Sequence, residues 1–142
     1  MDIRKIDDTI SVAPQITYED VAEAARLGFR TLVANRPDKE EFGQPAMADI
    51  EAAALENGLT WIYMPVQSGN VTDEDVDRFG EMIRDSEKPV LAFCRSGTRC
   101  TVLWALNAAR TTPAREVFSK ARNAGYDISG LAPRMEQQSR NR

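Results

Sequence analysis

The sequence predicts an α/β sandwich built around a mainly parallel sheet. Short apolar runs at residues 10–13, 31–34, 59–64 and 90–93 have the length and composition of strands. Helical patterns with capping residues and closing glycines separate these runs. Because a helix between two strands carries the chain back across the sheet, the strands run parallel and their carboxyl ends meet at one edge, where we expect the site.

Capping signals place the helices. A threonine followed three residues later by an aspartate forms a capping box before two of them, at Thr17 and Thr72. Thr112 is expected to cap the last helix, with Pro113 in its first turn. The helix that follows the fourth strand is apolar nearly all round, so we expect it to be the most buried. The expected helices span residues 18–27, about 47–57, 72 to near 85, 100–110 and 113–124.

The remaining segments are assigned by their polarity and position. The strand at Ile10–Ala13 is expected at an edge of the sheet. The polar loop 35–45, after the second strand, is long enough to cover a site. Residues 135–142 are polar and are expected to fray. We therefore expect one domain over residues 1–134 and a frayed polar tail over 135–142.

Composition limits the classes of partner. The 142 residues, 42% of them hydrophobic, are enough for one domain with a substantial core. A net charge of −4 and a pI near 4.9 argue against nucleic acid or an anionic membrane as the main partner. No apolar run reaches eighteen residues, and no secretion leader is recognisable, so we expect a cytoplasmic protein.

The chain has no histidine and two cysteines, Cys94 and Cys100. The lack of histidine excludes Ser-His-Asp triads, Cys-His dyads and histidine metal sites. Two cysteines by themselves do not make a zinc site, and in a reducing compartment they are expected to be thiols. We therefore expect neither a metal nor another cofactor.

The candidate catalytic and anion-binding residues lie in the loop after the fourth strand and at the start of the next helix. Cys94 lies where the chain leaves the sheet, Gly97 permits a sharp turn, and Arg99 lies at the start of the next helix. Unpaired amides of the loop and the helix terminus attract negative charge and, with Arg99, favour a thiolate at Cys94. Cys94 and Arg99 are the expected catalytic residues. The expected anion-binding loop consists of Arg95, Ser96, Gly97 and Thr98.

Arg36 and Asp38 are candidates for the rim of a substrate site, because the strand before them ends at the same edge of the sheet. The alternative is a locally paired, solvated loop. The residues alone leave these two interpretations equally open.

Several segments give the chain a family resemblance. Besides residues 94–99, they are Gly28-Phe29-Arg30, Asn35-Arg36-Pro37-Asp38, Gln44-Pro45 and Met64-Pro65-Val66. Over roughly residues 3–133 the chain resembles the bacterial beta-lactamase hydrolase-like protein, phosphatase-like domain family. The resemblance implies a protein-tyrosine-phosphatase-like three-layer sandwich with a four- or five-stranded, mainly parallel sheet flanked by helices. In related folds a serine that approaches the nucleophile follows the arginine, so Cys100 is a candidate to contact the thiolate or to resolve an oxidised Cys94 through a disulfide. The alternative is a small buried residue that starts the helix.

The loop also resembles that of rhodaneses, in the string Cys-Arg-Ser-Gly-x-Arg. Cysteine phosphatases space the nucleophile and arginine as C-x5-R, whereas Cys94 and Arg99 form C-x4-R, a shorter loop with less room. The general-acid aspartate of dual-specificity phosphatases is also missing from the expected loop, residues 66–70. The nearest carboxylates, beginning with Asp73, fall in the first turn of a helix, where acidic residues are favoured structurally.

These features lead to three hypotheses. The first is a rhodanese-type sulfurtransferase that moves sulfane sulfur from a persulfide, polysulfide or thiosulfate to a thiol acceptor through a Cys94 persulfide. Its partners would be a small sulfur-containing anion, a thiol acceptor and an enzyme of sulfide or persulfide oxidation. The alternative is a phosphatase-like hydrolase that acts on phosphomonoesters through a phosphocysteine. The third is an inactive redox or anion-sensing module.

Overall fold

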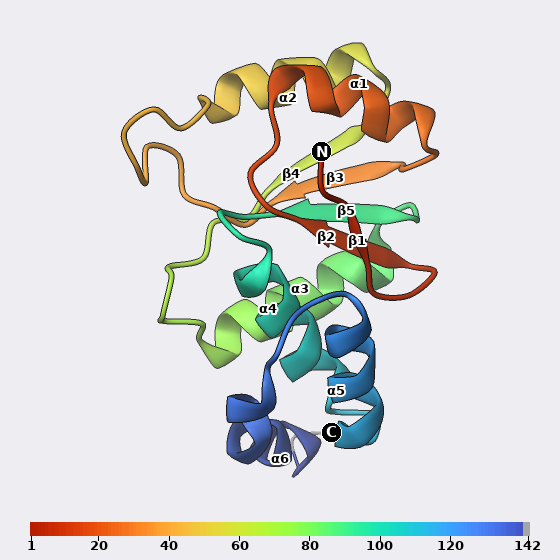
Figure 1. Cartoon of the computed structure of the whole chain (residues 1–142), viewed down its shortest axis with the longest axis vertical. Helices are drawn as coiled ribbons and strands as arrows, with labels where there is room; N and C mark the ends of the chain where they lie inside the picture. Colours follow the sequence, from red (N-terminus) through yellow and green to blue (C-terminus); the bar gives the residue numbers. More distant parts are fainter. Residues whose placement is uncertain (141–142) are drawn as a thin grey trace.

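The computed structural model describes residues 1–140 and places a five-stranded sheet between two layers of helices (Figure 1). The strand order is β1-β2-β5-β3-β4, in which only β1 is antiparallel to its neighbour. The mainly parallel α/β fold is therefore confirmed. The strands are β1 (Arg4–Lys5), β2 (Ile10–Ala13), β3 (Thr31–Ala34), β4 (Thr60–Tyr63) and β5 (Val90–Phe93).

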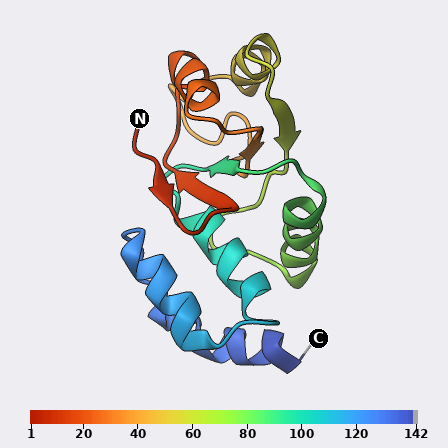
Figure 2. The ribbon, with the colours of Figure 1, turned by 90° about the vertical axis from the view of Figure 1, so that its right-hand side faces the viewer.

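Helices cover both faces of the sheet (Figure 2). On one face lie α1 (Tyr18–Arg26) and α2 (Met47–Glu56). On the other side lie α3 (Asp73–Asp85), α4 (Thr98–Ala108) and α5 (Ala114–Asn123). The short 3-10 helix η1 (Ser129–Leu131) leads into α6 (Ala132–Arg140), which packs on α4 and α5 away from the sheet. The capping boxes predicted at Thr17 and Thr72 are both formed. Each face thus has its own apolar core.

Strand β5 lies at the centre of the sheet and is buried on both faces. Leu91 and Phe93 pack in the core beneath α1 and α2, whereas Val90 and Ala92 pack in the core beneath α3 to α5. This alternation explains the continuous apolar sequence of the strand. The carboxyl end of β5 consequently opens into the middle of one sheet edge, between the loops that follow β2 and β3.

Two details differ from the sequence-based expectations. Ile10–Ala13 is not an edge strand, because β1 pairs with it. Two polar residues, Arg4 and Lys5, form β1 and carry no periodic apolar signal. Helix α5 has Pro113 at its N-cap without a side-chain hydrogen bond, so Thr112 does not cap it.

The expected frayed tail is helical over residues 135–140, which belong to α6. Met135 and Gln138 are buried, and the Arg110 Nε donates to Gln138 Oε1 at 2.9 Å. The Gln138 amide in turn donates to Asp73 Oδ1 at 2.8 Å. These contacts to α3 and to the end of α4 order a segment that looks unstructured from composition alone. Residues 141–142 of the expected tail lie outside the described residues.

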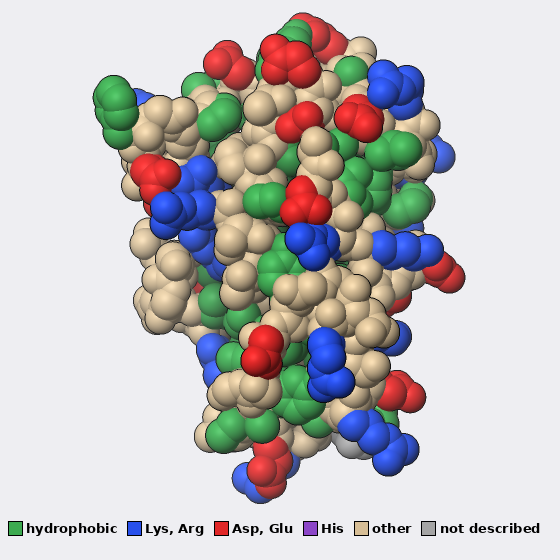
Figure 3. All heavy atoms as spheres, in the orientation of Figure 1, with side chains coloured by type: hydrophobic (Ala, Val, Ile, Leu, Met, Phe, Trp, Pro, Cys, Tyr) green, Lys and Arg blue, Asp and Glu red, His purple; other side chains and the backbone are tan. Residues whose placement is uncertain are grey.

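Basic and acidic side chains are interspersed on the face that Figure 3 shows. Ion pairs also link segments that are distant in the sequence, as between Arg110 and Asp77 and between Arg30 and Glu87. Within residues 1–140, the structure has no helix with the length and hydrophobicity needed to cross a bilayer.

Helices α3 and α4 approach closely at Gly80, where an added Cβ would overlap the Asn107 amide. We expect Gly80→Ala to lower the free energy of unfolding by about 1–3 kcal/mol, because it overpacks this contact. In an Asn107→Ala background the same change should be neutral or stabilising, since alanine is the better helix former. Chemical denaturation of the four variants measures both effects. Equal losses in the two backgrounds would contradict this account of the helix contact.

Candidate active site

The nucleophile loop begins directly after β5 and is tied to the loop that follows β2. The Cys94 amide donates to the Ala13 carbonyl at 3.3 Å, and the Gln15 amide donates to the Arg95 carbonyl at 3.2 Å. Gly97 then takes a left-handed conformation with φ of 89° and precedes the first turn of α4. Its amide donates to Cys94 Sγ at 3.1 Å. The turn predicted from Gly97 thus directs a backbone N–H at the sulfur.

Tyr126 holds the other side of this loop. Its hydroxyl donates to the Ser96 carbonyl at 2.9 Å, and a Cβ added to Gly97 would overlap that hydroxyl. Within the loop, Ser96 Oγ and Thr98 Oγ1 are hydrogen-bonded at 3.0 Å. Position 97 therefore requires glycine for two reasons, its backbone conformation and the close approach of Tyr126.

The two cysteines are buried and free, and each affects the pKa of the other. The Cys100 thiol is the main cause that lowers the pKa of Cys94 to about 6, and the amides of Cys100 and Gly97 and the charge of Arg99 add to it. Together they outweigh desolvation, which opposes ionisation. Burial, together with the hydrogen bond to Cys94, raises the pKa of Cys100. At neutral pH Cys94 is consequently the thiolate and Cys100 the thiol that donates to it.

Arg99 is held by several groups that are distant in sequence. Its Nη1 donates to the Val66 carbonyl at 2.9 Å and to Glu40 Oε2 at 3.1 Å, and its Nη2 donates to Glu40 Oε1 at 3.1 Å. The side chain is 8% exposed. Its buried Nε has no hydrogen-bond partner among residues 1–140. An unpaired buried N–H on a guanidinium costs free energy unless a ligand accepts its hydrogen bond.

Glu40 joins the two buried arginines. It accepts from Arg36 Nε at 2.9 Å as well as from Arg99. Burial by itself would raise the pKa of Glu40, but the hydrogen bonds from Arg99 and Arg36 outweigh it and lower that pKa. Next to it, Glu41 pairs with the exposed Arg95 at 3.1 Å. The loop 35–45 thereby supplies carboxylates that fix the arginines of the nucleophile loop.

Arg36 and Asp38 are engaged in this loop itself. Arg36 is 3% exposed and also donates to Gln15 Oε1 at 3.1 Å. Asp38 accepts from the Met47 amide at 3.2 Å at the start of α2. Neither residue lines the cavity described next. Their geometry matches the locally paired loop, and it gives the substrate-rim hypothesis no support.

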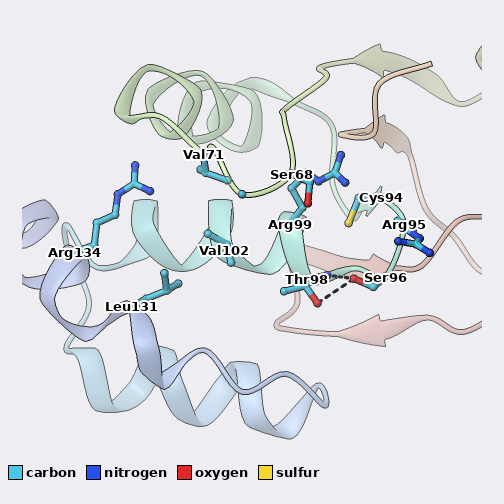
Figure 4. Close-up of a pocket in the computed structure, with 11 residues that line it drawn as sticks. Ser68, Val71, Cys94, Arg95, Ser96, Thr98, Arg99, Val102, Leu131 and Arg134 are labelled. Carbon is cyan, nitrogen blue, oxygen red and sulfur yellow. Dashed lines mark hydrogen bonds between the residues drawn. The ribbon is translucent and has the colours of Figure 1, made fainter. Parts of the chain in front are cut away.

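A cavity of about 560 Å³ opens above Cys94 and runs along α4 (Figure 4). The nucleophile loop, the loop between β4 and α3, and the segment from η1 to α6 form its walls. It is lined by Ser68, Gly69, Val71, Cys94, Arg95, Ser96, Thr98, Arg99, Val102, Leu131 and Arg134. Cys94 is 1% exposed and forms part of the floor. The volume is typical of a site for a small molecule.

The structure brings together the loop residues predicted from sequence and adds others. Cys94, Arg95, Ser96, Thr98 and Arg99 line one cavity. Sequence reasoning missed Glu40, Glu41 and Tyr126 and the far wall at Leu131 and Arg134. Glu40 and Glu41 could have been found from the sequence, because they lie in the loop that was expected to cover a site. Nothing in the sequence indicated that α6 reaches the cavity.

The loop in which a general acid would be expected contributes Ser68 and Gly69 to the cavity. Among residues 1–140 no carboxylate lines that cavity. Asp73 bonds to Arg134 and Gln138 at the end remote from Cys94. Its geometry is therefore that of a structural residue.

The thiolate assignment predicts the pH dependence of alkylation. Since the pKa of Cys94 is about 6, the rate of Cys94 modification by iodoacetamide should fall as pH drops below that value and level off above it. Cys100→Ala should shift the midpoint upward by removing the donor. Cys100→Ser, which retains a donor, should shift it less. Mass spectrometry of the Cys94 peptide gives the rates, and a midpoint near 8.5 in the unsubstituted protein would contradict the assignment.

Comparison with known sequences shows similarity to phosphatase-like domains. The family profile "Beta-lactamase hydrolase-like protein, phosphatase-like domain" matches residues 2–111. A beta-lactamase hydrolase-like protein of Agrobacterium fabrum (strain C58) is 28% identical over 137 residues, which are 95% of this chain and 32% of that protein. Its counterpart from Xylella fastidiosa (strain 9a5c) is 30% identical over 141 residues, 98% of this chain and 33% of that protein. The chain thus spans about a third of the length of these relatives.

Solved structures of phosphatases are also similar to this chain. A candidate phosphatase (nma1982) from Neisseria meningitidis Z2491 is 36% identical with a TM-score of 0.88, over 97% of this chain and 99% of that one. The catalytic core of the Saccharomyces cerevisiae PP-IP phosphatase SIW14 shares the fold, at 14% identity and a TM-score of 0.69, over 98% and 84% of the two chains. These likenesses confirm the tyrosine-phosphatase-like fold. The 36% identical structure and the family profile support a cysteine-nucleophile, phosphatase-like hydrolase. The chain belongs to the phosphatase-like domain family of the beta-lactamase hydrolase-like proteins.

Proposed function

We propose that this domain hydrolyses phosphate monoesters through a covalent phosphocysteine at Cys94. The observation that carries the proposal is the pairing, at one cavity, of a low-pKa thiolate with a buried guanidinium whose Nε is unpaired among residues 1–140. A phosphoryl oxygen bound there would accept the missing hydrogen bond and place the phosphorus beside the sulfur.

The reaction proceeds in two displacements. Cys94 Sγ attacks phosphorus, an S–P bond forms, the ester P–O bond breaks, and the leaving oxygen takes a proton from water. A water molecule then attacks the phosphocysteine, the S–P bond breaks, and inorganic phosphate and the thiolate are released. Arg99 and the loop amides stabilise negative charge on the phosphoryl oxygens in both steps.

The comparisons do not support the sulfurtransferase hypothesis. It rested on the short C-x4-R loop and, with more weight, on the missing general-acid aspartate. The cavity of about 560 Å³ has room for a phosphate ester, and no carboxylate among residues 1–140 lines it.

A direct comparison of substrates tests the proposal. We expect the domain to release phosphate from 4-nitrophenyl phosphate, and Cys94→Ser to lose that activity by at least about a hundredfold, because the nucleophile is absent. Phosphate release is measured with a colorimetric assay. Cys100→Ser serves as a matched control and should retain most of the activity, since it keeps a donor to the thiolate. Sulfur transfer from glutathione persulfide or thiosulfate without any phosphate release would overturn the proposal.

The cavity lining also predicts the leaving-group dependence. Since no carboxylate among residues 1–140 lines the cavity, the departing oxygen receives little help from an acid. We expect kcat/KM to fall steeply from 4-nitrophenyl phosphate to phenyl phosphate, and further to an alkyl phosphate. Initial rates over this series give the slope. Equal rates across the series would indicate protonation of the leaving oxygen and contradict this interpretation.

A further inference from the structure

The cavity is chemically different at its two ends. Cys94 and Arg99 lie at one end, and Arg134 of α6 lies at the other (Figure 4). Between them the walls are apolar, with Val71 from the loop before α3, Val102 from α4, and Leu131 from η1. A ligand that fills this space therefore meets a charged end, an apolar middle and a second basic end.

The Arg134 guanidinium can bind a carboxylate or another anionic group of a ligand. Its side chain is 31% exposed, and its Nη2 donates to Asp73 Oδ1 at 3.1 Å. No other hydrogen bond of this guanidinium is made within residues 1–140, so N–H groups are left for a ligand. Asp73 Oδ1 also accepts from the Gln138 amide at 2.8 Å, so a ligand carboxylate can bind the remaining N–H groups of Arg134 while Asp73 stays in place. By contrast, Arg95 and Arg99 are paired with Glu41 and Glu40 at the reacting end.

We propose that Arg134 and Leu131 form a second subsite, which binds the acidic far end of a small aryl phosphate substrate. The inference rests on the proposed hydrolysis at Cys94 and adds its substrate class. An aromatic body matches the apolar middle of the cavity, and a phenolic leaving group matches a cavity without a lining carboxylate among residues 1–140. A carboxylate or other anion at the far end of the ring pairs with Arg134.

The apolar walls also argue against densely phosphorylated polyols. Hydroxyl and phosphate groups placed against Val71, Val102 and Leu131 would lose their hydrogen bonds to water without gaining partners. The volume of about 560 Å³ is suited to a small molecule. A small molecule therefore fits this cavity better than the flat surface of a folded protein does.

Two esters that differ in one charge test the subsite. The probes are 4-(2-carboxyethyl)phenyl phosphate and its methyl ester, which have the same ring and the same leaving oxygen. We expect kcat/KM of the unsubstituted domain to be about fivefold higher for the carboxylate, as befits a partly exposed ion pair. Arg134→Gln should bring the ratio of the two values close to one. Asp73→Asn should increase the ratio, because the ion pair with Asp73 weakens the attraction of Arg134 for an anion.

Arg115→Gln is the matched control, since it removes one positive charge from an exposed position on α5. It should keep the ratio of the unsubstituted domain. A ratio of one in that domain, or an unchanged ratio in Arg134→Gln, would overturn the subsite.

Calorimetric binding of both esters to Cys94→Ser separates the two proposals. If neither ester is hydrolysed by the unsubstituted domain, the proposed hydrolysis is wrong, and the ratio of the two affinities still decides the subsite. Tighter binding of the carboxylate, lost in the Cys94→Ser, Arg134→Gln double variant, supports it. Equal affinities overturn it.

Discussion

The site depends on how the protein stabilises a negative charge on a nearly buried sulfur. Removing a thiolate from water is unfavourable unless hydrogen bonds replace the lost solvation. Here the Cys100 thiol donates to Cys94, the Gly97 and Cys100 amides add their dipoles, and Arg99 supplies a positive charge. All of these groups come from the loop after β5 and the first turn of α4. The left-handed conformation of Gly97 and the close contact of Tyr126 are what hold that loop in place.

The cationic part of the site needs a wider framework. Arg99 contacts the Val66 carbonyl after β4 and Glu40 after β3, so it joins the loops that follow both parallel strands to the start of α4. Glu40 in turn holds Arg36, which reaches Gln15 after β2. Because the parallel strands end at one edge of the sheet, four loops that are distant in sequence converge on one network. Arg36 Nη2 and Arg99 Nε are both left without a hydrogen-bond partner among residues 1–140, and of the two side chains Arg99 lines the cavity, where an anion can accept from it.

The far half of the cavity is formed by a later segment of the chain. The match to the family profile ends at residue 111, whereas Leu131 and Arg134 come from the segment that follows α5. That segment is fixed to the body of the domain through Gln138, which bonds to Arg110 and Asp73. The nucleophile loop and the remote wall of the cavity are therefore carried by separate parts of the chain.

The sequence alone determined the four longer strands with the helices between them, the nucleophile loop and the acidic character of Cys94. These features depend on local patterns: apolar runs, capping boxes, and a glycine between a cysteine and an arginine. Other features required the tertiary structure. The pairing of β1 with β2 and the helical state of residues 135–140 result from contacts with partners far along the chain. The same is true of the space above Cys94. Side chains from the loop before α3 and from η1 and α6 form the walls of that space, and no local pattern records where those segments pack.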